Sequence, residues 1–291
     1  MKVSILLRQA RVHQWVKNAL VLVPLLAKHA FTEGEVWRNS LLAALALSLV
    51  ASATYILNDF FDLAKDRAHP DRRKRPLAAG EISVRQALAW AGLLLGSGLL
   101  VAALAGGWVL GLLLGYLAAS GLYSWKLKEV AVVDTLLLSL FYNFRVVLGG
   151  VAAGIVLSEW LTIFIFFFFL SLAYAKRFGD ITVTEGQATR YRRPYQESDQ
   201  PYFLATGIAC ALLAIFSLVL YTQSEQASRL YGQPMALWGA ILVLFAWTSR
   251  LWLQTARGQL HSDPVLAALR DPGSYLALLL LVPSFLLAQP L

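Results

Sequence analysis

Nine long apolar runs dominate this chain and limit what it can fold into. They lie near residues 14–31, 37–59, 84–105, 107–124, 131–153, 159–178, 201–222, 235–253 and 274–290. An α-helix needs about 20 mostly apolar residues to cross a bilayer. Of the residues, 58% are hydrophobic and 14% are charged, whereas roughly 25% are charged in an ordinary soluble domain. The sequence therefore predicts an all-α, polytopic membrane protein with a bundle of nine transmembrane helices, and it excludes an ordinary cytosolic enzyme.

The distribution of positive charge predicts how these helices are oriented. Twenty of the 25 Lys and Arg residues lie in five segments that alternate along the chain with segments poor in both. The five segments are 1–17, 60–84, 125–130, 176–200 and 250–273. Because cytoplasmic loops carry an excess of Lys and Arg, the N-terminus and these loops are predicted to be cytoplasmic. No cleavable signal peptide is expected, and residues 1–291 are predicted to form a single integral membrane domain.

Three aspartates follow one another at the end of the second apolar run. Asp59, Asp62 and Asp66 are spaced so that, at about 100° per residue, they share one face of a helix. Carboxylates this close repel one another unless a cation lies between them. Carboxylates without His or Cys suit Mg²⁺, which completes its shell with phosphate oxygens and water. The alternative interpretation is a solvated helix end whose acids balance the neighbouring bases.

Basic residues follow these aspartates in the segment 60–84. Arg67, Lys74 and Arg75 are complementary in charge to phosphate, and Asn58 precedes the first aspartate. Acids and bases together indicate a metal–diphosphate site, with this segment as one active-site loop.

A second group of charges opens the segment 176–200. Asp180 and Glu185 are predicted ligands for a metal or for hydroxyl groups, and Lys176 and Arg177 are predicted phosphate contacts. The alternative is an ordinary basic cap at the cytoplasmic end of the sixth apolar run.

Arg145 lies well inside the fifth apolar run, where an arginine is costly and usually faces the protein interior or a water-filled cavity. An anionic ligand or an acid on another helix is its predicted partner. Lys126 and Lys128, in the short segment before this run, are either phosphate contacts or orientation charges. No Ser/His/Asp set, P-loop or zinc pattern is present in the sequence.

The motif from Asn58 to Asp66, the basic loop after it and the later acid-bearing loop resemble the UbiA superfamily of intramembrane prenyltransferases. The resemblance covers nearly the whole chain. It implies a bundle of nine transmembrane helices with an Mg²⁺–diphosphate site at the cytoplasmic face. The aromatic prenyltransferases of this superfamily usually carry two aspartates at DxxxD-like spacing, where this chain has Lys176–Asp180.

The sequence is more similar to the branch that transfers phosphoribosyl groups to decaprenyl-type lipid phosphates. Its hallmarks match Arg11–Asn18 with Pro24, Asn58–Pro70, Arg75–Pro76, Leu127–Lys128 with Asp134 and Arg145, Lys176–Asp180 and Asp263–Leu266. The chain departs from that branch at Val12, where Pro is common, and at Asp180, where Glu is common.

This resemblance implies transfer of a 5-phosphoribosyl group from 5-phosphoribosyl 1-diphosphate to a polyprenyl phosphate, with Mg²⁺ as cofactor, in the inner membrane of a bacterium. Asp59, Asp62, Asp66 and Asp180 are the predicted catalytic residues. The other predicted roles are Mg²⁺ ligation by Asp59, Asp62 and Asp66 with support from Asn58; diphosphate or 5-phosphate binding by Lys17, Arg67, Lys74 and Arg75; ribose hydroxyl or second-metal binding by Asp180 and Glu185; and lipid or sugar phosphate binding by Arg145, Lys126 and Lys176.

Two other functions are left open. One is an aromatic prenyltransferase of the same fold that makes a quinone or haem precursor. The other is a transporter or lipid-binding protein, supported only by the intramembrane Arg145 and lacking an evident inverted repeat or paired broken helices. No nucleic-acid partner is predicted, and a homo-oligomer is left open.

Overall fold

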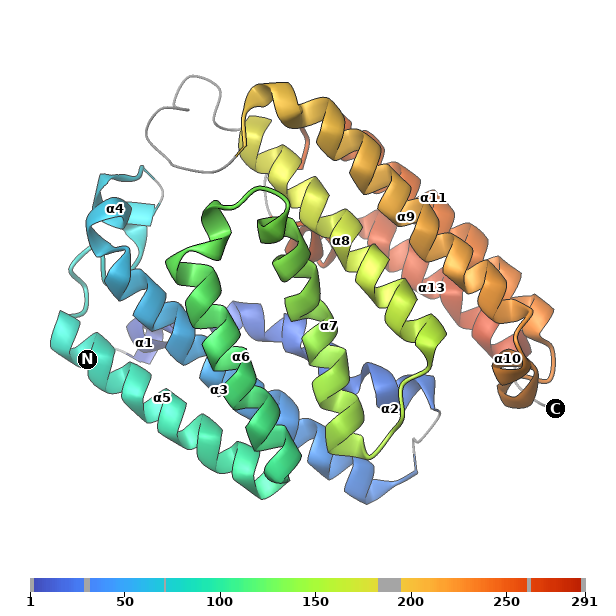
Figure 1. Cartoon of the computed structure of the whole chain (residues 1–291), viewed down its shortest axis with the longest axis horizontal. Coiled ribbons are helices and arrows are strands. Elements are labelled where there is room, and N and C mark those ends of the chain that lie inside the picture. The colour runs from blue at the N-terminus through green and yellow to red at the C-terminus, as the bar shows by residue number, and fades with distance from the viewer. Residues whose placement is uncertain (1–2, 29–31, 71, 183–194, 261–262, 289–291) are drawn as a thin grey trace. The chain divides into compact units, whose positions relative to one another are not determined.

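The computed structural model describes residues 3–28, 32–70, 72–182, 195–260 and 263–288, and every regular element within these ranges is a helix (Figure 1). Among the described residues, seven helices are long and apolar enough to cross a membrane. They are α3 (Gly34–Phe61), α5 (Val84–Ala105), α6 (Gly107–Trp125), α7 (Val133–Ala153), α8 (Glu159–Thr182), α9 (Gln200–Thr222) and α11 (Leu237–Ala256). The prediction of an all-α, polytopic membrane protein is confirmed.

The remaining elements are shorter. They are α1 (Val3–Gln9), η1 (Val12–Leu22), α2 (Val23–Ala27), α4 (Leu63–Ala68), η2 (Arg72–Lys74), η3 (Leu127–Glu129), η4 (Glu197–Asp199), α10 (Glu225–Leu230), η5 (Pro234–Ala236), α12 (Pro264–Ala268) and α13 (Pro272–Ala288).

The first and last predicted spans differ from the other seven. The run 14–31 is divided between the 3-10 helix η1 and the short helix α2, and its last residues fall outside the described part. Within η1, Trp15 donates a hydrogen bond to Ser52 of α3, so this segment is tied to its neighbour by polar contacts as well as by apolar packing. The last run forms α13, which is apolar but has 17 residues. The count of nine spans stays a prediction.

The chain folds into two compact units, the first made of residues 1–127 and 144–157 and the second of residues 128–143 and 158–291. Helix α7 contributes residues to both. The expectation of a single domain stays a prediction.

Helix α3 is the centre of the first unit. It packs against α5, η1 and α6, and 61% of its apolar window is buried, against 17% for α6. Small residues allow neighbouring helices to approach closely in membranes. A Cβ atom at Gly98 of α5 would lie 2.8 Å from the side chain of Val50, and one at Gly149 of α7 would collide with the carbonyl oxygen of Val21. The Gly98 contact holds the middle of α3 close to α5, and the Gly149 contact holds α7 close to η1.

The segment that follows those aspartates is fixed at its far end by the start of α5. Ser83 and Gln86 form a capping box, in which each side chain bonds to the backbone of the other residue. Such reciprocal bonds satisfy backbone N–H groups that a helix start leaves unpaired.

In the second unit, α8 packs against α9, α9 against α11, and α11 against α13. Trp252 of α11 donates a hydrogen bond to Ser171 of α8 at 2.9 Å, and the Ser171 hydroxyl donates to the carbonyl of Gly207 in α9 at 2.8 Å. A Cβ atom at Gly207 would collide with the Trp252 ring, so glycine is required where these three helices meet.

Candidate active site

Two buried carboxylates lie at the junction between α3 and α4. Asp59, in the last turn of α3, is 3% exposed, and Asp66, in α4, is 1% exposed. The chain bends between them, because α3 ends at Phe61 and Asp62 has a ψ of 9° before α4 begins. Burying a charge is costly unless it is paired, so the contacts of these two side chains define the site.

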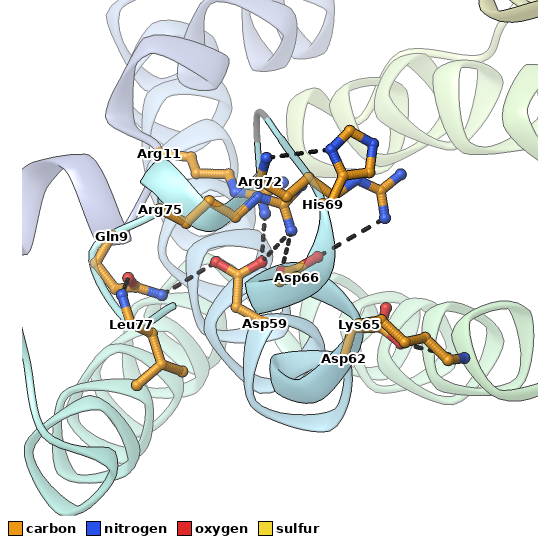
Figure 2. Close-up of polar contacts among 10 residues, drawn as sticks. All are labelled: Gln9, Arg11, Asp59, Asp62, Lys65, Asp66, His69, Arg72, Arg75 and Leu77. Atoms are coloured by element: carbon orange, nitrogen blue, oxygen red, sulfur yellow. Dashed lines mark hydrogen bonds and ion pairs between the residues drawn. The ribbon is translucent and has the colours of Figure 1, made fainter. Parts of the chain in front are cut away.

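Arginines neutralise this pair of carboxylates. The Nη1 atom of Arg75 donates to Oδ1 of Asp59 at 2.9 Å and to Oδ2 of Asp66 at 2.6 Å. Arg11 donates to the same oxygen of Asp59, and Arg72 Nη1 lies 3.7 Å from Oδ1 of Asp66. Figure 2 shows the three guanidinium groups converging on the two carboxylates. Three guanidinium groups thus face two carboxylates, and guanidinium groups bind phosphate oxygens as well as carboxylate oxygens.

Three residues of this cluster, Gln9, Arg11 and Arg72, have no role predicted from the sequence. Gln9 donates to Oδ2 of Asp59 at 3.1 Å, and the guanidinium of Arg11 also lies over the ring of Tyr55, 5.0 Å from its centre. Arg11 has a φ of 52°, a backbone conformation that residues other than glycine adopt only at a cost. Both contacts join segments about 50 residues apart, and the only indication in the sequence is the position of Arg11 at the head of the motif Arg11–Asn18.

Asp62 lies apart from the other two aspartates. Its side chain points toward Lys65, whose Nζ atom is 3.8 Å from Oδ1 of Asp62 (Figure 2). The expectation that three carboxylates share one helix face is wrong, because the helix is interrupted at Asp62. Its predicted role as a metal ligand stays a prediction.

The other predicted contacts of the first unit differ in burial. Lys17 in η1 is buried and Asn58 in α3 is partly buried, whereas Arg67, Lys74 and Lys126 are exposed. Arg75 differs from all of them, because its hydrogen bonds place it between the two buried carboxylates.

Arg145 is buried inside α7, as the cost of an intramembrane charge predicts. Its Nε atom donates to Oδ1 of Asn18 at 3.0 Å, and the amide of Asn18 donates to the hydroxyl of Ser48 at 2.9 Å. The guanidinium is therefore oriented by a polar chain that runs from α7 through η1 to α3. The role of Arg145 in binding an anion stays a prediction.

In the second unit, Arg177 is held by two carboxylates. Its Nε and Nη2 atoms donate to the two oxygens of Asp134 at 2.6 and 2.7 Å, and its Nη1 atom donates to Asp180 at 2.8 Å. Asp134 is 1% exposed. Bidentate pairs of this kind are rigid, so Arg177 and Asp180 are held in place by Asp134, a residue of the sequence motif to which no role was assigned.

The start of the predicted loop 176–200 carries a second ion pair. Lys176 lies 3.6 Å from Asp263.

Tyr195 lies near the other end of this loop. Its hydroxyl accepts a hydrogen bond from the backbone N–H of Val132 at 3.0 Å, and burial raises the pKa of Tyr195. Glu185 lies outside the described residues.

The residues of the first cluster fit Mg²⁺, which is bound in proteins by one or two carboxylates together with substrate phosphates and water. Oδ1 of Asp66 is buried, lies 3.7 Å from Nη1 of Arg72 and accepts no hydrogen bond from the described residues, so it could also accept a metal ion. Among the described residues, no group of three or more His, Cys, Asp or Glu could hold a metal ion. The fit is therefore to a shared site in which the substrate supplies further oxygens.

Comparison with known proteins places the chain in a family. Residues 21–190 match the UbiA prenyltransferase family. Uncharacterized protein y4nM of Sinorhizobium fredii is 35% identical over 97% of this chain, and the chain spans only about half (55%) of that relative. Decaprenyl-phosphate phosphoribosyltransferase of Mycolicibacterium smegmatis is 30% identical over 92% of this chain and 87% of its own length.

A solved structure shows the same fold. It is that of a UbiA homolog from Archaeoglobus fulgidus bound to GPP and Mg²⁺, with a TM-score of 0.72, 17% identity and coverage of 98% of this chain and 99% of the other. The protein is thus an enzyme, a transferase of the membrane, and it belongs to the UbiA prenyltransferase family.

Proposed function

We propose that this protein transfers a 5-phosphoribosyl group from 5-phosphoribosyl 1-diphosphate to a polyprenyl phosphate and releases diphosphate, with Mg²⁺ as cofactor. The proposal is supported by the relatives named decaprenyl-phosphate phosphoribosyltransferase, such as the one from Mycolicibacterium smegmatis.

The observation that carries the proposal is the buried pair Asp59 and Asp66 with the guanidinium of Arg75 between them. Asp59 and Asp66 are the residues that would hold Mg²⁺, which when bound supplies charge neutralisation for the diphosphate. Arg11, Arg72 and Arg75 stabilise the negative charge that grows on the diphosphate as it departs.

The reaction breaks the bond between the anomeric carbon and the diphosphate oxygen, and the electron pair leaves with the diphosphate. A phosphate oxygen of the lipid forms the new bond to the same carbon. Because the lipid phosphate is already an anion, its attack needs no general base. A cluster rich in Asp and Arg is suited to this chemistry.

The remaining residues keep the roles that the resemblance implies. They are Asp62 and Asn58 at the metal site; Lys17, Arg67 and Lys74 at the diphosphate or 5-phosphate; Asp180 and Glu185 at the ribose hydroxyls or a second metal; and Arg145, Lys126, Lys176 and Arg177 at the lipid or sugar phosphate. Arg177 is buried, and each of its terminal nitrogens already bonds a carboxylate.

We also propose that residues 1–291 act as one integral domain of a bacterial inner membrane, with the N-terminus and the segments 60–84 and 176–200 on the cytoplasmic side. The alternation of basic segments supports this orientation.

A turnover assay with two pairs of substrates tests the proposal. The purified protein is incubated with Mg²⁺, polyprenyl phosphate and 5-phosphoribosyl 1-diphosphate, and in parallel with a prenyl diphosphate and 4-hydroxybenzoate. The expected result, read by mass spectrometry, is a lipid heavier by one phosphoribosyl unit in the first tube and no new lipid when EDTA replaces Mg²⁺.

The competing functions predict other results. A prenylated aromatic product in the second tube alone would identify an aromatic prenyltransferase. Movement of lipid or solute across proteoliposomes without bond cleavage would identify a transporter. Either result would reject the phosphoribosyl transfer proposed for this chain.

A further inference from the structure

Gln9, the last residue of α1, joins three segments of the first unit. Its Nε2 atom donates to Oδ2 of Asp59 at 3.1 Å, and its Oε1 atom accepts the backbone N–H of Leu77 at 3.1 Å. The Gln9 side chain is 1% exposed, and Leu77 is 2% exposed. Figure 2 shows this amide beside the carboxylate of Asp59, with Leu77 on its other side.

These two contacts require an amide of this length. The carboxylate of Asp59 needs a donor, whereas the N–H of Leu77 needs an acceptor, and the glutamine side chain supplies both. A glutamate would lack the donor, and a methionine would lack both groups. A buried backbone N–H left without an acceptor costs free energy. The side chain at position 9 therefore needs both a donor and an acceptor.

The two carboxylate oxygens of Asp59 have different hydrogen-bond partners. Within the part of the chain that the structure describes, the guanidinium contacts of Asp59 both reach Oδ1, while Oδ2 receives the neutral amide of Gln9. The rotation of the carboxylate is thereby fixed. Leu77 follows Arg75 by two residues, so the same amide fixes the backbone that carries the bridging arginine.

We infer that Gln9 is a positioning residue of the metal–diphosphate site, which holds Asp59 in the orientation that binds the metal and anchors the segment that carries Arg75. This inference rests on the proposed function, in which Asp59 is a ligand. Hydrogen-bond partners of ligating carboxylates commonly contribute a factor of about 10 to 100 in metal affinity.

The test compares Gln9→Met with Gln86→Met. Gln86 also accepts a backbone N–H, that of Ser83 at 3.1 Å, but its side chain is exposed, so the control loses a similar bond away from Asp59. Binding of Mn²⁺ in the presence of 5-phosphoribosyl 1-diphosphate is measured by electron paramagnetic resonance. We expect binding about tenfold weaker in Gln9→Met and within about twofold of wild type in Gln86→Met.

A kinetic readout separates positioning from simple stabilisation. In Gln9→Met, the Mg²⁺ concentration for half-maximal turnover should rise by about the same factor as the Mn²⁺ dissociation constant, while kcat at saturating Mg²⁺ falls less. A folded Gln9→Met protein with unchanged Mn²⁺ affinity would overturn the inference, and Gln9 would then only tie α1 to the following loop.

If Gln9→Met does not fold, Gln9→Glu replaces it. The glutamate keeps an acceptor for Leu77 N–H and removes the donor to Asp59. Weaker Mn²⁺ binding supports the inference, and equal or tighter binding overturns it. Asp66→Asn in the same titration tests the site itself: wild-type binding there rejects the proposed function, whereas a loss confined to Asp66→Asn rejects only the inference about Gln9.

Discussion

Replacing Asp66 with Asn is expected to lower turnover about 100-fold or more, because it removes one of the two buried carboxylates that would bind the metal ion. The change conserves shape, and Asp66 is 1% exposed beneath Arg75 and Arg72. The measurement is the rate of formation of the phosphoribosylated lipid as a function of Mg²⁺ concentration. Asp59→Asn is expected to have a similar effect, since Asp59 contacts the same atom of Arg75.

Glu81→Gln is the matched control for this acid-to-amide change. Glu81 forms an ion pair with Arg8 at 2.6 Å in the same unit, and the two side chains are 35% and 55% exposed. Exposed pairs contribute little to stability, so turnover should stay within about twofold of wild type. A folded Asp66→Asn protein with normal turnover and normal Mg²⁺ dependence would show that these carboxylates do not form the metal site.

Replacing Asp134 with Ala is expected to destabilise the second unit strongly. The change takes the bidentate partner from Arg177, whose side chain is 8% exposed. Removing one partner of a buried ion pair costs about 3–5 kcal/mol, and Arg177 would keep only its single bond to the partly exposed Asp180. The apparent Tm in detergent should fall by roughly 6 °C or more.

Two companion variants test this explanation. Asp180→Asn leaves the pair between Arg177 and Asp134 intact and removes the ion pair between Arg177 and Asp180. Because the Asp180 side chain is 29% exposed, the effect on Tm should be small. The double variant Asp134→Leu with Arg177→Met should recover part of the loss, because no buried charge remains. A Tm for Asp134→Ala equal to that of wild type would show that this pair does not stabilise the second unit.

Much of the fold could be predicted from the sequence, because the length of an apolar run is fixed by the thickness of the bilayer. The segment around Trp15 and Asn18 is the instructive exception. Its polar side chains bond to Ser52 and Ser48 of α3, and the chain there forms a 3-10 helix instead of a long α-helix. Hydropathy measures how apolar a run is and carries no information on such contacts.

The candidate site could be predicted only in part. The seven-residue spacing of Asp59 and Asp66 predicted two carboxylates close together, and both of them bond the same atom of Arg75. The role of Arg75 at a phosphate, which charge complementarity predicted, stays a prediction. The spacing of Asp62 misled, because the helix is interrupted at that residue. Gln9 and Arg11 reach the site from a segment about 50 residues earlier, and no local pattern in a single sequence reports a contact over that distance.

The fate of the 5-phosphate and of the terminal phosphate of the donor tests the central claim most directly. The purified protein is given polyprenyl phosphate, Mg²⁺ and 5-phosphoribosyl 1-diphosphate that carries ³²P either on the 5-phosphate or on the terminal phosphate of the diphosphate. Phosphoribosyl transfer predicts that the 5-phosphate label enters the lipid phase while the terminal label stays in water as diphosphate. Terminal label in the lipid, or 5-phosphate label that remains in water, would contradict the account.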